Sequence, residues 1–367
     1  MIALLPLAIC TIATLVCLIS LGRATAPRPA ASQASPPLTV LKPLCGADEQ
    51  LRASLATFFV QDYPDYELVF GVVSPTDPAV PVVRELMAAF PAVRARLVIH
   101  AGNQGLNPKV ANLRGMIAPD AHDHLVISDS NVAVGPGYLR SLVSRLEPGV
   151  ELVTSLIRGA EEQTLGSVLE SLHLGGSVAG AVAAAEALSG DALLVGKSVL
   201  FRRSVFEKLG GMETLGAVLA EDYVMGRMFT EAGHGVRVAT EVVRNVTQKA
   251  TLFGFVRRQA RWALLRSRLT PLLYPFEPLL NPVAAGLLAA LLGAAPLPVL
   301  AWAFGLGLAR DGISALLVGG RPAAAPLAFL KDLLVLGAWA AAPFKRRVSW
   351  RGRRFRISAG TRLYAQA

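Results

Sequence analysis

Residues 125–131 read LVISDSN, three apolar residues followed by a short polar run. An apolar, partly β-branched run of this length is typical of a strand buried on both faces. Asp129 and Asn131 then alternate, so an extended backbone directs both side chains to the same side. Their oxygens suit a hard divalent cation, which often binds together with phosphate. Because ligands of open α/β sheets lie beyond the carboxyl ends of strands, we predict a metal–diphosphate site here, with a simple Asp-Ser-Asn turn as the alternative.

The composition indicates a membrane protein with a soluble part. Of the 367 residues, 53% are hydrophobic and 17% are charged, and the mean hydropathy is +0.48. The net charge is +10, and no acidic residue follows Asp332, whereas eight Lys and Arg residues do. A basic tail of this kind is typical of a cytoplasmic segment near anionic lipid. Nucleic-acid binding is disfavoured, since no recognition motif accompanies the basic cluster.

The amino-terminal segment predicts a membrane anchor. Residues 2–21 form an uninterrupted apolar run, and Arg23 follows it. The run is long enough to cross a bilayer, and the positive-inside rule places Arg23 in the cytoplasm. A cleaved signal peptide is the alternative, since residues 24–26 offer an Ala-Thr-Ala site, but the run lacks a basic start. We therefore expect an anchor over residues 1–23 and a linker rich in Ala, Pro and Ser over 24–37.

Strand-like runs and helical patterns alternate across residues 38–248. The strands are expected at 38–41, 67–73, 97–100, 125–128, 151–157 and 193–201. The helices are expected at 48–61, 79–90, 108–118, 137–146 and 167–187. This alternation predicts an α/β domain with a mostly parallel sheet covered by helices.

The carboxyl-terminal third predicts membrane contact. Residues 249–276 begin with a helix, to residue 269, that mixes aromatic and arginine side chains as interfacial helices do. Within 277–344, three apolar segments follow, at 281–298, 299–319 and 326–344. If the soluble domain and the basic tail at 345–367 are both cytoplasmic, the number of crossings is even, so two segments cross and one is re-entrant. Lys331 and Asp332 make the last segment the expected exception.

Three positions around the predicted sheet could contact a nucleotide. Asp77 follows a strand and can accept hydrogen bonds from a base or ribose, although a Pro-Asp-Pro turn is the better explanation of this residue taken alone. Lys109 lies in the first turn of a helix that starts at Asn107-Pro108, where diphosphate binds well, or it is an exposed lysine. Lys197 lacks the glycine spacing of a P-loop, but a contact with the acceptor or with phosphate stays open.

Two further clusters could carry chemistry. Glu221 and Asp222 open a helix whose dipole favours their ionised forms, so one of them could act as a general base; ordinary acidity at a helix start is the alternative. Arg258, Arg261 and Trp262 lie on one face of a helix. The two guanidinium groups could hold a leaving diphosphate and the indole a sugar or lipid, unless the arginines merely snorkel at an interface.

The order of these motifs resembles the ceramide glucosyltransferase family, membrane-bound inverting glycosyltransferases of GT-A fold. The motifs are Asp77-Pro78, GLNPK at 105–109, Asp129-Ser130, Glu221-Asp222 and RxxRW at 258–262. The stretches at 40–44, 61–64 and 348–355 are also similar. The resemblance implies a Rossmann-like nucleotide-sugar domain with an amino-terminal transmembrane anchor and carboxyl-terminal membrane helices.

The resemblance also implies roles for individual residues. Asp77 would bind uridine, Asp129 the divalent metal (Mg²⁺ or Mn²⁺) on the diphosphate, and Asp222 would be the catalytic base. Arg258, Arg261 and Trp262 would hold the leaving group and the acceptor. Arg258 replaces a frequent Gln, and Asn131 replaces the Gly of animal enzymes and could add a ligand to the metal or to the sugar. We further assign Lys109 and Glu221 to the nucleotide-sugar.

The expected reaction moves a hexose or N-acetylhexosamine from a UDP-sugar to a lipid hydroxyl. The acceptor would be a sphingolipid or, as in similar bacterial enzymes that use N-acetylglucosamine, a hopanoid polyol. The protein would be a multi-pass protein of the bacterial inner membrane, in contact with the bilayer, with its catalytic domain in the cytoplasm and no nucleic-acid partner. A processive polysaccharide synthase, which shares the RxxRW motif, and a non-catalytic, membrane-anchored basic binding protein are the alternatives.

Overall fold

The computed structural model describes residues 2–28, 34–101, 105–345, 347–350 and 353–365. It divides into two compact units. The sheet unit comprises Ala24–Ile157 and Ala185–Val246, and the helical unit comprises Met1–Arg23, Arg158–Ala184 and Thr247–Ala367. Residues 29–33 of the predicted linker, residues 102–104, and residues 346, 351–352 and 366–367 of the basic tail lie outside the described residues.

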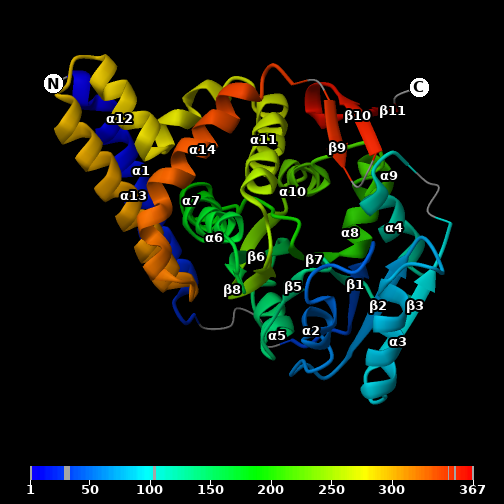
Figure 1. The fold of residues 1–367 in the computed structure, drawn as a ribbon. Coiled ribbons are helices and arrows are strands. Elements are labelled where there is room, and N and C mark those ends of the chain that lie inside the picture. Colours follow the sequence, from blue (N-terminus) through cyan, green and yellow to red (C-terminus); the bar gives the residue numbers. More distant parts are fainter. Residues whose placement is uncertain (1, 29–33, 102–104, 346, 351–352, 366–367) are drawn as a thin grey trace. The chain divides into compact units, whose positions relative to one another are not determined.

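An eight-stranded sheet forms the core of the sheet unit, with the order β3-β2-β1-β4-β7-β6-β8-β5 (Figure 1). The strands are β1 Leu38–Pro43, β2 Tyr66–Val72, β3 Arg94–Ile99, β4 His124–Ser128, β5 Val132–Ala133, β6 Val150–Ala160, β7 Ser198–Arg202 and β8 Gly235–Val246. Strands β1, β2 and β4 match the expected positions to within two residues, because their apolar runs are buried. The long strand β8 was not predicted.

The parallel part of the sheet is smaller than the sequence suggested. Strands β3, β2, β1 and β4 pair in parallel, but β7 is antiparallel to β4, β6 to β7, and β5 to β8. The expectation of a mostly parallel sheet is therefore corrected to a mixed one. The chain leaves β1 towards β2 and β3 on one side and later adds β4 on the other. That reversal of strand order is where ligands bind in such folds.

The helices of the sheet unit are α2 Leu51–Ala56, α3 Ala79–Ala89, α4 Pro108–Met116, α5 Tyr138–Val143, α8 Arg203–Lys208, α9 Gly211–Leu215 and α10 Glu221–Glu231. Helix α4 begins where the sequence predicted, because the Asn107 side chain accepts hydrogen bonds from the backbone N–H groups of Lys109 (2.9 Å) and Val110 (3.1 Å). Pro108 occupies the first helical position, where its missing N–H costs nothing. Helix α2 is shorter than the predicted helix over 48–61.

The helical unit is built on α1 Leu5–Thr25, α6 Leu165–Leu172, α11 Leu252–Leu269, α12 Pro282–Leu291, α13 Pro296–Val318 and α14 Ala328–Ala341. After α6 the chain continues through a π-helical segment, His173–Val178, into α7 Ala179–Ser189. Helix α11 packs against α6 and α14 and starts at Thr251, whose hydroxyl accepts from the Gly254 N–H at 2.9 Å. A three-stranded antiparallel sheet, β9 Arg347–Trp350, β10 Arg353–Ile357 and β11 Leu363–Ala365, ends the described chain.

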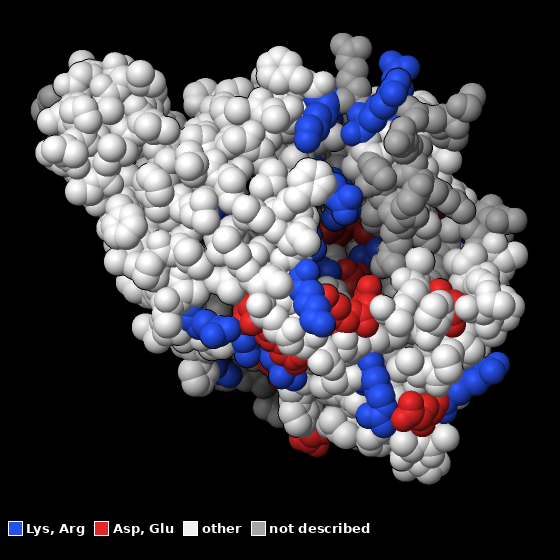
Figure 2. Space-filling model, in the orientation of Figure 1, with Lys and Arg blue, Asp and Glu red and all other residues white. Residues whose placement is uncertain are grey.

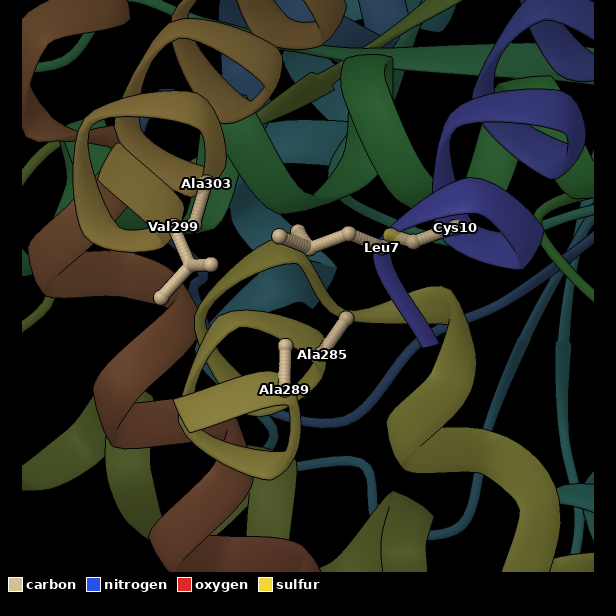
Figure 3. Packing of buried hydrophobic residues seen from close by; sticks show 6 residues of the cluster. All are labelled: Leu7, Cys10, Ala285, Ala289, Val299 and Ala303. Atoms are coloured by element: carbon tan, nitrogen blue, oxygen red, sulfur yellow. The ribbon is translucent and has the colours of Figure 1, made fainter. Parts of the chain in front are cut away.

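Helix α1 is an integral part of this unit. Its Leu7 and Cys10 pack in one buried cluster with alanines of α12 and with Val299 and Ala303 of α13 (Figure 3). Small side chains of this kind let apolar helices approach closely. The face over α1, α12 and α13 is almost entirely uncharged in Figure 2.

Within the part of the chain that the structure describes, four helical stretches are long and apolar enough to cross a membrane, namely Ile2–Thr25, Leu165–Ser189, Pro296–Val318 and Pro322–Ala341. Of the three apolar segments predicted near the carboxyl terminus, the first begins with the 10-residue helix α12. Ten residues rise only about 15 Å, half the hydrocarbon thickness. By helix length, α12 is the shortest of the three, whereas the charges of Lys331 and Asp332 pointed to the last segment. Both of these charges have ion-pair partners inside the unit. Which of the segments cross a membrane stays a prediction.

Candidate active site

Asp129 follows β4 directly, beyond the carboxyl ends of β1 and β4. Ser128 pairs with Ser198 of the antiparallel strand β7, and the Asp129 N–H donates to the carbonyl of Lys197 at 3.3 Å. Strand pairing therefore brings Lys197, which is distant in sequence, beside Asp129.

Two lysines hold the Asp129 carboxylate. Lys109 Nζ lies 2.9 Å from Oδ1 and Lys197 Nζ lies 3.0 Å from Oδ2. Burial alone would raise the pKa of Asp129, but the two ammonium groups outweigh it and hold this pKa well below its usual range. Asp129 is therefore ionised at neutral pH and able to bind a cation.

Lys109 connects Asp129 to the acidic start of α10. Its Nζ also lies 3.2 Å from Glu221 Oε1 and 3.1 Å from the Gly196 carbonyl oxygen. Burial disfavours the charge on Lys109, yet the carboxylates of Asp129, Glu221 and Asp222 together raise its pKa above the ordinary value. The structure thus brings Lys109, Asp129 and Glu221, all predicted site residues, into one ion-paired group.

Glu221 and Asp222 lie in the first turn of α10 and line a hollow together with Lys109 and apolar side chains. Burial and the neighbouring Asp222 raise the pKa of Glu221, while Lys109 opposes the shift. The Asp222 Oδ2 accepts from the Gly196 N–H at 2.9 Å, and its Oδ1 accepts from the Tyr223 N–H at 2.8 Å. A Cβ on Gly196 would lie 2.9 Å from Asp222 Oδ2, so this close approach requires glycine. Asp222 is consequently held in a fixed orientation.

Lys42 also lies in this region, although the sequence motifs gave it no role. Its side chain is fully buried on β1, donates to the Asp129 carbonyl at 2.6 Å and to Ser128 Oγ at 3.2 Å, and lies 3.8 Å from the centre of the Phe58 ring. Burial lowers the pKa of Lys42 well below its ordinary value, with Asp129 opposing the shift and Lys197 adding to it. A lysine inside the apolar run 38–43 was the signal that could have revealed it.

Asp129 and Asn131 fit a metal that shares its coordination with a substrate. The Asn131 amide is oriented because its Nδ2 donates to Asn245 Oδ1 (3.1 Å) and to the Val246 carbonyl (3.2 Å), and its Oδ1 accepts from Lys197 at 3.0 Å. Among the described residues, no group of three or more His, Cys, Asp or Glu side chains could hold a metal alone. A hard cation bound by one carboxylate and one amide would complete its coordination with phosphate oxygens and water, as Mg²⁺ usually does.

Asp77 contacts the backbone around the end of β1. Its carboxylate accepts from the Gly46 N–H at 3.0 Å and from the Ala79 N–H at 2.8 Å, at the start of α3. It follows β2, which is separated from β4 by β1. Asp77 thus has the turn-stabilising role that the sequence left as an alternative, and its assignment to uridine stays a proposal.

Arg258, Arg261 and Trp262 lie on α11, in the helical unit. Arg258 pairs with Glu170 of α6, with 2.7 Å between NH1 and Oε1. Trp262 lies 5.8 Å from the His173 ring, centre to centre. Glu170 is only 2% exposed, so Arg258 serves first as its counter-ion, a partner that the motif alone did not reveal.

Comparison with known proteins identifies a family that matches most of the chain and relatives that match parts of it. Residues 2–363 match the family described as glycosyl transferase family 21. The chain is 29% identical over 257 residues to ceramide glucosyltransferase 1 of Caenorhabditis elegans, covering 70% of this chain and 55% of that protein. It is 34% identical over 118 residues to the ceramide glucosyltransferase of Komagataella phaffii, covering 31% and 23%. The chain thus spans little more than half the length of the first of these relatives.

A solved structure shares the fold. It is the mannosyltransferase PcManGT from Pyrobaculum calidifontis in complex with GDP-Man and Mn²⁺, with a TM-score of 0.51 and 18% identity, covering 94% of this chain and 99% of that one. The likeness confirms the expected GT-A fold.

Proposed function

The chain belongs to glycosyl transferase family 21, and on that premise we propose that it is a membrane-bound inverting glycosyltransferase. It moves a hexose or N-acetylhexosamine from a UDP-sugar to the hydroxyl group of a lipid. The C. elegans relative is named a ceramide glucosyltransferase, which supports a lipid acceptor of the sphingolipid class. A hopanoid polyol is the second acceptor that we propose.

One observation carries the proposal. Asp129, Lys109 and Glu221 form a single ion-paired group at the carboxyl end of the central strands, and Asp222 lines the hollow beside Lys109. A nucleoside diphosphate requires cations that balance its charge, and a nucleophilic hydroxyl requires a carboxylate that accepts its proton. The reversal of strand order between β1 and β4 places the group where such folds bind nucleotides.

In the proposed reaction Asp222 removes the proton from the acceptor hydroxyl. The oxygen then attacks the anomeric carbon from the side opposite the diphosphate, and the bond to the diphosphate breaks, which inverts the configuration. The N–H groups of Gly196 and Tyr223 orient the Asp222 carboxylate for this step. Lys109 keeps an ammonium group beside the leaving diphosphate and stabilises its developing charge.

Asp129 and Asn131 would hold the divalent metal, Mg²⁺ or Mn²⁺, which supplies charge neutralisation on the diphosphate when bound. PcManGT was solved with Mn²⁺ and a nucleotide sugar, which supports this assignment. Asp77 binds the uridine part of the donor, while Arg258, Arg261 and Trp262 hold the leaving group and the acceptor.

The apolar helices would place the protein in a bilayer, from which the lipid acceptor enters. We propose two carboxyl-terminal crossings, Pro296–Val318 and Pro322–Ala341, with the catalytic domain and the basic tail on the cytoplasmic side of a bacterial inner membrane. Helix α1 stays as an anchor, which its packing against α12 and α13 supports.

Turnover in isolated membranes tests the proposal. Membranes containing the protein are given labelled UDP-glucose or UDP-N-acetylglucosamine with Mn²⁺ or Mg²⁺, and the lipid fraction is analysed by mass spectrometry. We expect one singly glycosylated lipid that is absent when Asp222→Asn replaces the wild type. A polymeric product, or equal product from both proteins, would contradict the proposal.

A further inference from the structure

Lys197 occupies the space between the two oxygens assigned to the metal. Its Nζ lies 3.0 Å from Asp129 Oδ2 and 3.0 Å from Asn131 Oδ1. We propose that Lys197 is an internal cation that competes with a divalent metal for these oxygens and gives way when a nucleoside diphosphate arrives with the metal. This inference rests on the proposed function, since it concerns the loading of the same site.

The backbone at Lys197 is held in place, so only its side chain has to move. Its carbonyl accepts from the Asp129 N–H at 3.3 Å, and the next residue, Ser198, begins β7 and pairs with Ser128. A lysine ammonium on its flexible four-carbon stem can change partners by rotation of the side chain alone. Lys197 would therefore leave Asp129 and still remain beside the site.

Lys109 holds the same carboxylate but is less free to leave. Its Nζ contacts Asp129, Glu221 and the Gly196 carbonyl, and its side chain is 17% exposed. The Lys197 side chain is 25% exposed, and its ammonium contacts the two proposed metal ligands. Of the two lysines, Lys197 is therefore the one that a metal would displace.

Charge balance explains why the displacement needs the nucleotide. A divalent metal alone would bring two positive charges beside Lys109 and would leave the ammonium of Lys197 without its carboxylate. Like charges at such separations repel strongly in a partly buried site. A diphosphate brings negative charge that balances the metal and offers Lys197 new acceptor oxygens.

The consequence is thermodynamic coupling between metal and nucleotide. If Lys197 competes with the metal, the metal alone binds weakly, and UDP raises its affinity. By linkage, the metal raises the affinity for UDP by the same factor. Removing the Lys197 charge removes the competitor, so the metal alone binds more tightly and the coupling factor falls.

Mn²⁺ binding to the full chain in detergent tests the inference. Free Mn²⁺ is measured by electron paramagnetic resonance, with and without UDP, for the wild type, Lys197→Met and the control Lys208→Met, which changes an exposed lysine of the same unit. For the wild type and the control, we expect UDP to raise Mn²⁺ affinity at least about tenfold. Lys197→Met should bind Mn²⁺ alone at least about tenfold more tightly than the wild type, and UDP should add less.

Two results separate the inference from the proposed function. If UDP promotes Mn²⁺ binding in the wild type but Lys197→Met binds Mn²⁺ alone no more tightly, the inference is overturned and the proposed function stands. If UDP promotes no Mn²⁺ binding and Asp129→Asn changes nothing, both fail. Thermal unfolding checks each variant, and Lys197→Gln replaces Lys197→Met if the latter does not fold. Lys197→Arg, which keeps the charge, should resemble the wild type.

Discussion

The charged group around Asp129 differs from a second charged group, in the helical unit, in how completely it is closed. In the second group Arg310 binds Asp311 at 2.8 Å and Asp332 at 2.9 Å, and Lys331 binds Asp311 at 2.7 Å. The side chains of these four residues are at most 7% exposed, and their formal charges cancel. Around Asp129 the paired side chains are 15–25% exposed, and Lys197 bridges two acceptors that a metal could take.

The difference separates a structural role from a functional one. Ionisable residues in an apolar helix are a functional signal by default, because an unpaired charge in a membrane is costly. Here the four charges satisfy one another on adjacent elements α13 and α14, which fixes the two helices against each other. Charged side chains that are buried and fully paired stabilise the fold, whereas charged side chains that are partly exposed and can change partners are able to bind a substrate.

The largest expected effect is a loss of activity, which should follow from a substitution in the site around Asp129 and not from one in the second charged group. Asp222→Asn should lower turnover by about 10²–10⁴-fold, because a general base contributes that much. The midpoint of thermal unfolding should fall only slightly, since the amide oxygen can still accept from one of the two N–H groups, that of Gly196 or that of Tyr223. Initial rates of lipid glycosylation and a melting curve in detergent check this. A variant that keeps half of the wild-type rate would remove Asp222 from the chemistry.

The next effect separates the groups by stability. Arg310→Met should destabilise the protein by about 3–5 kcal/mol, because it leaves the buried carboxylate of Asp332 without its main partner. The measurement is unfolding in detergent. Joint replacement of Arg310, Asp311, Lys331 and Asp332 by Met and Leu should recover most of that loss. Recovery of stability with full turnover would support a structural role. Recovery of stability with lost turnover would show that the closed group is functional after all.

A smaller effect concerns the ion pair on α11. Arg258→Gln alone leaves Glu170 buried without its cation, whereas Glu170→Gln together with Arg258→Gln gives two neutral amides. We expect a coupling energy of about 0.5–3 kcal/mol in a double-mutant cycle for unfolding. A coupling energy near zero would mean that Arg258 is free to serve the diphosphate instead.

The smallest effect is a dependence on pH. Because the folded-state pKa of Asp129 is lowered, its contribution to stability is present above its ordinary value of 3.8 and is lost as the pH falls through the folded-state value. In Asp129→Asn, the free energy of unfolding should therefore fall less steeply as the pH is lowered. Unfolding measured between pH 3 and pH 6, about the range in which carboxylates titrate, checks this. If the free energy of unfolding falls with pH equally steeply in the wild type and the variant, the two lysines do not stabilise the ionised Asp129 carboxylate.

The elements that local patterns specify were predictable. The strand before Asp129 is a buried apolar run, and the helix that carries Lys109 begins at an Asn-Pro cap, so both were placed correctly. Contacts that depend on pairing between segments distant in sequence were not predictable. The antiparallel addition of β7, which brings Lys197 to Asp129, and the contact of Glu170 with Arg258 arise from tertiary packing that no local pattern encodes. The partners of Lys331 and Asp332 were hidden for the same reason, since Asp311 and Arg310 lie on another helix.

The central claim is that the open group around Asp129 binds the nucleotide. Calorimetric titration of UDP in the presence of Mn²⁺ tests it on the wild type, on Asp129→Asn and on Asp62→Asn, which makes the same chemical change at a 71% exposed aspartate of the same unit. We expect the wild type and Asp62→Asn to bind UDP equally and Asp129→Asn to bind at least about tenfold more weakly. Equal affinity in all three proteins would contradict the claim.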